Sequence, residues 1–258
     1  MTDAAWRQMA ARLSWVTAGT FLVASVVVLL LSFNVTAAEP TFAPDATFVD
    51  NILASFEDQQ ARWIQDLGSS LLFAVGFAAI AALGATLRHV LGRDDPRTML
   101  TTATFLLAGA IGIASQLIYI GGTEVATNPQ YCDCDYLAEE VISRAMIRDV
   151  INGISFWMID GFSVLFAVGL IAVASVSSAA GSMPAAWLAF TRLVAIAGLA
   201  SVVWNRVAIP LLIQAGYQDL DYGRIGSIIL FVVAGILVPV WAAWLARALG
   251  TTSAEPAT

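Results

Sequence analysis

Long runs of apolar residues, separated by short polar segments, dominate the pattern of hydrophobic and polar positions along the chain. Each run is long enough to cross a hydrocarbon core of ~30 Å, for which about 20 helical residues suffice. The runs are apolar on all faces and lack the two-residue alternation of membrane β-strands. The pattern therefore predicts an all-α, polytopic transmembrane helical bundle with six spans, at about residues 13–35, 67–87, 100–120, 151–175, 185–213 and 225–245.

Two polar loops contain a different, helical periodicity. In "DATFVDNILASFEDQQARWIQDL", apolar residues recur largely at steps of three and four, with carboxylates and glutamines between them. The segment "DYLAEEVISRAMIRDVIN" has a similar pattern before the fourth span. We expect two amphipathic outer helices that lead into the second and fourth spans. Such helices either lie in the membrane interface or cap the bundle.

Composition agrees with a membrane protein of several spans. Hydrophobic residues make up 59% of the chain and charged residues only 12%, with a mean hydropathy of +0.80; an ordinary soluble domain is about 25% charged. We expect one domain over residues 1–250 and a short disordered tail over 251–258. The first run is followed by small residues in "FNVTAAEP", as a cleaved signal peptide would be. Its length favours a retained anchor instead.

The arginines predict the orientation of the bundle. Seven of them lie in or beside the terminal segments and the even-numbered loops, against four carboxylates, whereas the outer segments have four arginines and fourteen carboxylates. The positive-inside rule therefore predicts cytoplasmic termini in a bacterial inner or plasma membrane. The outer acidity either attracts cations or simply solvates the loops. No basic patch suits nucleic acid, so the expected partners are the bilayer, with a membrane-protein partner or a homo-oligomer as further candidates.

Several residue types needed for catalysis are missing. The chain has no lysine, which excludes a retinal or pyridoxal Schiff base. Its only histidine is His89, in a predicted cytoplasmic loop, and the spans contain one carboxylate. Serine proteolysis with a histidine base, a paired aspartyl site and histidine-ligated haem are therefore not expected. No phosphate-binding or nucleophile-elbow motif occurs. We expect a non-enzymatic protein with no cofactor.

Two charges are predicted to lie inside the spans. Asp160, in "SFWMIDGFSVLF", is about 13 Å from the outer end of the fourth span at ~1.5 Å per residue, and Arg206, in "VVWNRVAIP", is about 10 Å deep in the fifth. A charge at this depth costs several kcal/mol unless it is paired or hydrated, and it marks a functional site by default. Because the depths agree, we predict that adjacent antiparallel helices bring the two groups together.

A polar pocket is predicted around these charges. Pro210 cannot bond to the carbonyl of Arg206, so the helix is expected to kink at the charge. Either the pair is a ligand or ion site, or it only fixes helix packing. Pro239, with Gly235, is interpreted as a packing kink. The remaining candidate pocket residues are Asn205, Gln116, Trp157 and Trp204.

The only two cysteines, Cys132 and Cys134, lie in the acidic outer stretch "QYCDCDYLAEE". In an oxidising compartment thiols tend to pair, so a disulfide between them is one hypothesis. Unpaired or intersubunit thiols are a second. A metal site that adds Asp133 and Asp135 is a third, although zinc usually takes four ligands and the outer segments have no histidine.

Two stretches resemble a known family. The segments "DNILASFEDQQARWIQDLGSSLLFAVGFAAIAAL" and "GSMPAAWLAFTRLVAIAGL" are similar to a family of six-helix bacterial integral membrane proteins whose function is not established. The resemblance implies the bundle but no catalytic residues. The most favoured function is transport or sensing of a small solute around Asp160 and Arg206. The alternatives are an accessory subunit of a membrane complex, or a membrane enzyme or metal/redox protein that uses the cysteine loop.

Overall fold

The computed structural model describes residues 2–33, 47–92, 95–127, 138–217 and 222–251. Within these residues the fold is helical, without strands. Two of the spans are interrupted by π-helical segments, labelled η2 and η3. The elements are α1 (Asp3–Ser32), α2 (Phe48–Leu91), α3 (Pro96–Thr127), α4 (Ala138–Ala180), α5 (Ala185–Val203), η2 (Trp204–Ala208), α6 (Ile209–Gln214), α7 (Tyr222–Leu230), η3 (Phe231–Leu237) and α8 (Val238–Thr251).

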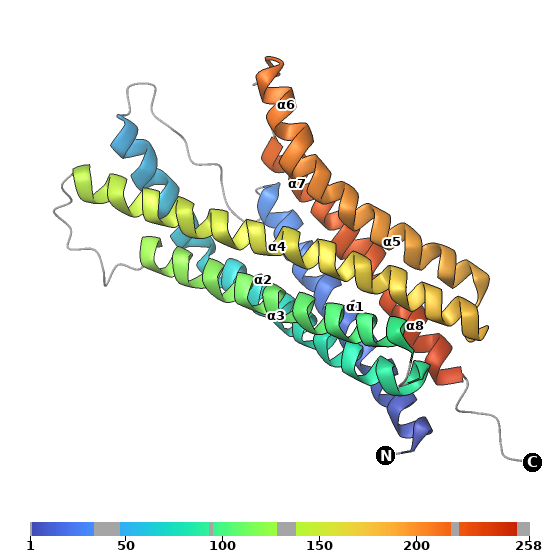
Figure 1. The fold of residues 1–258 in the computed structure, drawn as a ribbon. Helices are drawn as coiled ribbons and strands as arrows, with labels where there is room; N and C mark the ends of the chain where they lie inside the picture. The colour runs from blue at the N-terminus through green and yellow to red at the C-terminus, as the bar shows by residue number, and fades with distance from the viewer. Residues whose placement is uncertain (1, 34–46, 93–94, 128–137, 218–221, 252–258) are drawn as a thin grey trace, which may run out of the picture.

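Six helices of the described chain are long and apolar enough to cross a membrane. They coincide with the six predicted runs, and the chain has the architecture of a multi-pass membrane protein. The start of α1 and the end of α8 lie at the same end of the bundle, as an even number of spans requires (Figure 1). Which end faces the cytoplasm stays a prediction from the arginines.

The helices pack in chain order, and the sixth span returns to the first. Helix α1 packs against α2 and α8, and α4 packs against α3 and α5. A chain of aromatic side chains crosses the core: Phe21 contacts Phe77 edge to face, and Phe77 in turn contacts Phe162 of α4. Near the turn between α4 and α5, Trp187 stacks on Trp241 of α8. Because Phe166 of α4 also packs edge to face against Trp241, aromatic packing through α4 holds the two sides of the bundle together.

Small residues allow the close approach of α2 and α3. A Cβ atom at Gly109 would lie 2.5 Å from the carbonyl oxygen of Phe77 and 2.6 Å from the Cβ of Ala81. The contact is to backbone, so it cannot be relieved by rotating a side chain. Small residues at such positions are the usual means by which membrane helices pack closely.

Each outer amphipathic segment forms one continuous helix with the span that follows it, in α2 and in α4. The side chain of Arg148 joins the two segments. This side chain donates to Ser55 Oγ at 3.3 Å and to Gln59 Oε1 at 3.4 Å, and it lies 5.1 Å from the ring centre of Phe56. The segments therefore extend the bundle as a packed pair, rather than as two separate interfacial helices.

Some predicted boundaries need correction. The first span was expected to reach residue 35, but α1 ends at Ser32, where the N–H of Phe33 bonds to the carbonyls of Leu29 and Leu31. The tail was expected from residue 251, which is still the last residue of α8; residues 252–258 lie outside the described chain. The kink expected at Pro239 is a π-helical segment, η3, that ends just before the Val238–Pro239 pair.

We predict that Gly109→Ala lowers the free energy of unfolding by about 1–3 kcal/mol, because the methyl group has no space between α2 and α3. Thermal unfolding in detergent, followed by circular dichroism, measures the loss. Gly121→Ala is the matched control on the same helix, since nothing lies within 4 Å of its Cβ position. It should leave stability unchanged or raise it by up to about 1 kcal/mol. Equal effects of the two substitutions would contradict the close approach.

Candidate functional site

The turn between α4 and α5 sets the register of the candidate site. Helix α4 ends at Ala180, Gly181 has a left-handed φ of 61°, and Pro184 caps α5. From this turn Asp160 and Arg206 are each about 20 residues away, or about 30 Å along antiparallel helices at ~1.5 Å per residue. A tight turn and equal spacing therefore place both charges at the same level of the bundle.

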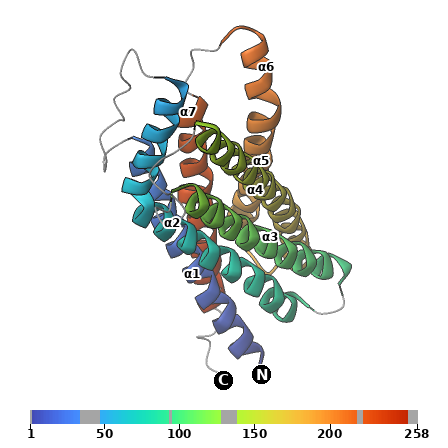
Figure 2. The ribbon, with the colours of Figure 1, turned by 90° about the vertical axis from the view of Figure 1, so that its left-hand side faces the viewer.

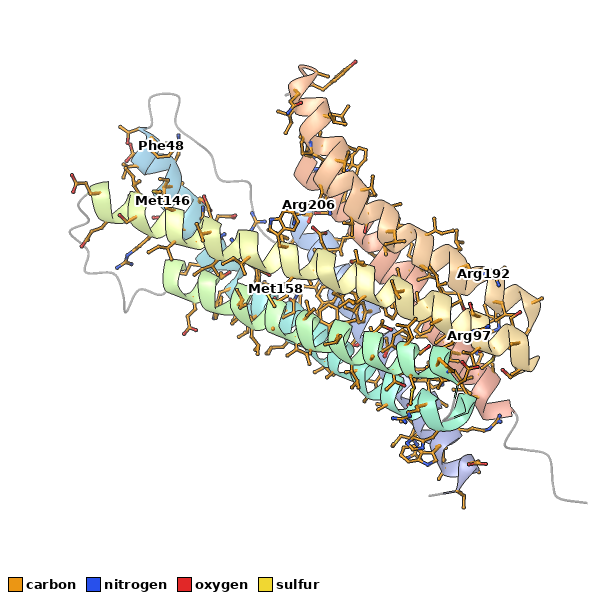
Figure 3. All side chains as sticks on the ribbon, viewed as in Figure 1. Phe48, Arg97, Met146, Met158, Arg192 and Arg206 are labelled. Carbon is orange, nitrogen blue, oxygen red and sulfur yellow. The ribbon has the colours of Figure 1, made fainter. Side chains whose placement is uncertain are left out.

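Asp160 and Arg206 form an ion pair, as the sequence predicted. The Nε of Arg206 donates to Oδ2 of Asp160. The Asp160 side chain is 11% exposed, whereas that of Arg206 is 30% exposed. Arg206 lies where its helix faces α4 (Figure 3). The pairing removes most of the cost that either charge alone would have at this depth.

Trp157 provides a second contact to the guanidinium. The Cζ atom of Arg206 lies 3.9 Å from the centre of the Trp157 ring, in a cation–π arrangement. Trp157 and Asp160 are three residues apart on α4, so their side chains share one face of the helix. One helix thus provides both an anion and an aromatic surface to the same arginine.

Arg206 is located on a π-helical turn. In η2 the N–H of Ile209 bonds to the carbonyl of Trp204, five residues back. The predicted disruption is therefore present, but as a wider turn immediately before Pro210 rather than as a simple kink. A proline cannot donate to the carbonyl four residues earlier, and a π turn is one way for a helix to accommodate this. Such turns are frequent at functional sites.

Several side-chain donors of η2 have no protein acceptor. Within the part of the chain that the structure describes, the guanidinium uses only Nε, which leaves its two Nη groups without an acceptor. Trp204 Nε1, on the same π turn, is buried and also lacks one. Buried donors are nearly always bonded to protein or to ordered water, so the orphaned indole N–H of Trp204 needs an explanation, whereas the guanidinium of Arg206 is partly exposed. A bound ligand or water would provide it.

The other predicted pocket residues do not join the pair. Asn205 is exposed and Gln116 is half-buried on α3, and neither bonds to Asp160 or Arg206 among the described residues. The neighbouring contact that the sequence analysis missed is between Ser115 and Ser155. Each hydroxyl lies 3.0 Å from the other residue's carbonyl oxygen, which links α3 to α4. A small polar residue at similar depth in each span was the available signal.

The cysteine hypotheses cannot be placed in this geometry. Cys132 and Cys134, with Asp133 and Asp135, lie outside the described residues. The disulfide, the free thiols and the metal site therefore all stay predictions.

Comparisons with known proteins do not identify a relative. No family model matches the chain, and no curated protein or solved structure matches it either. The resemblance to six-helix bacterial membrane proteins therefore stays a prediction, and the site must be judged on its own geometry.

We predict that exchanging the two charges restores folding that each single exchange loses. Asp160→Arg and Arg206→Asp each place two like charges together within the span, which should cost about 3–5 kcal/mol. The double variant recreates the pair and should recover at least half of that loss. Thermal unfolding in detergent and the monodisperse yield report the effect. A double variant no more stable than the single variants would show that the contact contributes nothing.

Proposed function

We propose that the protein binds a small polar solute at Asp160 and Arg206, for transport across the membrane or for sensing. The observation that carries the proposal is the incomplete enclosure of Arg206. A pair that only fixed helix packing would be expected to be fully enclosed by the surrounding helices. Here the guanidinium is paired through a single nitrogen and remains 30% exposed.

The arrangement suits a solute with a hydrogen-bond acceptor or an anionic group. Arginine offers a planar fork of N–H donors that matches carboxylate-like acceptors. The Nη groups of Arg206 are available for this. The exposed ring of Trp157, at 63%, supplies an apolar surface beside them. A charged pair next to an aromatic wall is typical of small-molecule sites.

The surroundings of the π turn support access to the site. No residue of η2 or α6 is buried. Toward this end of the molecule α6 diverges from the outer half of α4 (Figures 1 and 2). Movement of α6 relative to α4 would change the contact between Arg206 and Asp160 directly. The site thus lies where α6 separates from α4. From this position ligand binding can alter helix packing.

A role as an accessory subunit is the second candidate. The outer segments of α2 and α4 have large exposed apolar side chains beyond the apolar spans, including Phe48, Ile64 and Met146. Exposed apolar surface of this kind often marks contact with another protein or with membrane. In that role the ion pair would serve only to hold α4 against the fifth span.

Water access to the ion pair tests the proposal. In a background with Cys132→Ser and Cys134→Ser, we expect Trp157→Cys and Asp160→Cys to react with a membrane-impermeant thiol reagent added from outside. Trp157→Cys is the main variant because it leaves both charges in place. Reaction requires the thiolate, which forms where water reaches. Both variants should therefore react at least about tenfold faster than a cysteine that faces lipid.

Val164→Cys is the matched control, one turn further along α4 from Asp160. Val164 is exposed on the protein surface but lies on an apolar stretch of the span. Gel filtration verifies that each variant is folded. Absence of labelling at position 157 in a folded variant would contradict solute binding from water and would favour the accessory role.

A further inference from the structure

A groove between α3 and α4 lies near the turns that connect the second span to the third and the fourth to the fifth. Its volume is about 500 Å³, within the ~300–1,000 Å³ usual for small-molecule sites. It is separate from the ion-pair site, which lies closer to the middle of α4, at Asp160. The lining residues are Arg97 and Leu100 from α3, with Val168, Ile171, Ala172 and Ser175 from α4.

Among the described residues, Arg97 is the only charged one that lines this groove. Within the described chain its guanidinium has no carboxylate partner; the nearby Asp95 accepts the backbone N–H of Arg97 at 2.7 Å. An arginine that is exposed and positively charged at the end of an apolar groove is complementary to an anionic group. The charge bias of the loops predicts that this end faces the cytoplasm, where membrane lipids carry most of their negative charge.

The groove walls next to Arg97 are apolar and lie on the exposed surface of the bundle. Leu100 and Ile171 are each about half exposed, and Val168 and Ala172 lie between them and the core. Small side chains at Ala172 and Ser175 leave the hollow that a larger residue would fill. In a helix that crosses a membrane, this surface meets acyl chains. The groove therefore combines a cationic end at headgroup level with an apolar channel directed toward the bilayer centre.

A second groove repeats this design on another side of the bundle. It has a volume of about 530 Å³ and is lined mainly by Trp15 of α1 together with Val240, Trp244 and Arg247 of α8. The Cζ atom of Arg247 lies 5.9 Å from the centre of the Trp15 ring. Arginine beside tryptophan at the end of a span is the usual combination at the headgroup level of a membrane. The recurrence suggests that this end of the protein is adapted to bind individual lipids.

We propose that the groove between α3 and α4 binds an anionic phospholipid of the inner leaflet. Its phosphate accepts hydrogen bonds from the guanidinium of Arg97, and one acyl chain lies along Leu100 and Ile171. Arginine suits phosphate because its N–H groups can donate in pairs. This lipid site is independent of the solute site at Asp160 and Arg206, so the two proposals fail or succeed separately.

Native mass spectrometry of the full-length protein in neutral detergent tests the lipid site. The protein is titrated with phosphatidylglycerol and, in parallel, with phosphatidylcholine of the same acyl chains. We expect tighter binding of phosphatidylglycerol, and Arg97→Gln should weaken that binding about fivefold while changing the binding of phosphatidylcholine little. Ile171→Trp, which fills the groove, should weaken the binding of both lipids.

Arg192→Gln is the matched control. Arg192 is exposed on α5 at the same end of the bundle as Arg97 (Figure 3), but it lines neither groove. This variant should bind phosphatidylglycerol as the original chain does. Equal losses in Arg97→Gln and Arg192→Gln would overturn the proposal, because they would indicate general attraction to positive charge. Displacement of phosphatidylglycerol by millimolar inorganic phosphate would also overturn it, since the groove would then bind a soluble anion.

Discussion

The cost of placing charge inside a bilayer is the constraint on which the outer half of this structure depends. Asp160 and Arg206 meet across two antiparallel spans, and each removes most of the penalty of the other. Their contact requires the register that the tight turn at Gly181 and Pro184 provides. Once α4 and the fifth span are aligned in this way, Trp157 also reaches the guanidinium. One electrostatic requirement thus determines the position of a helix pair and of the candidate site.

The two ends of the bundle are built differently. Near the turn between α4 and α5, Trp187 and Trp241 are fully buried, and the indole N–H of Trp241 donates to Thr191 Oγ1 at 3.2 Å, which joins α5 to α8. At the other end, η2 and α6 bury no residue, and α6 diverges from α4 (Figure 2). The fifth span is therefore tightly packed where it begins, in α5, and loosely packed where it ends, in η2 and α6. Arg206 lies on η2, where the loosely packed part of this span begins and where the ion pair still holds it to α4.

Much of the candidate site was predictable because charge in an apolar run is rare and conspicuous. Asp160 and Arg206 were recognisable from their positions in apolar runs, and their matching depths followed from the helical rise. Asn205 and Gln116 were grouped with them by depth, but depth does not determine which face of a helix a residue occupies. The π turn at η2 shifts the faces of the residues that follow it, and a pattern with period 3.6 cannot represent that shift. The link between Ser115 and Ser155 was also missed, because a single serine in a span does not indicate a contact.

The sequence by itself determined that the chain forms six membrane-spanning helices, because apolar segments of this length must satisfy their backbone hydrogen bonds internally in lipid. It also determined that two charges lie deep in those helices, and which classes of chemistry lack the necessary residues. Only the tertiary structure decided that Asp160 contacts Arg206 and that Arg148 joins the outer segments of α2 and α4. It also decided that Arg97 lies at the end of an apolar groove. These contacts depend on helix rotation and crossing, which are set by the packing of many side chains at once and leave no local signal in the chain.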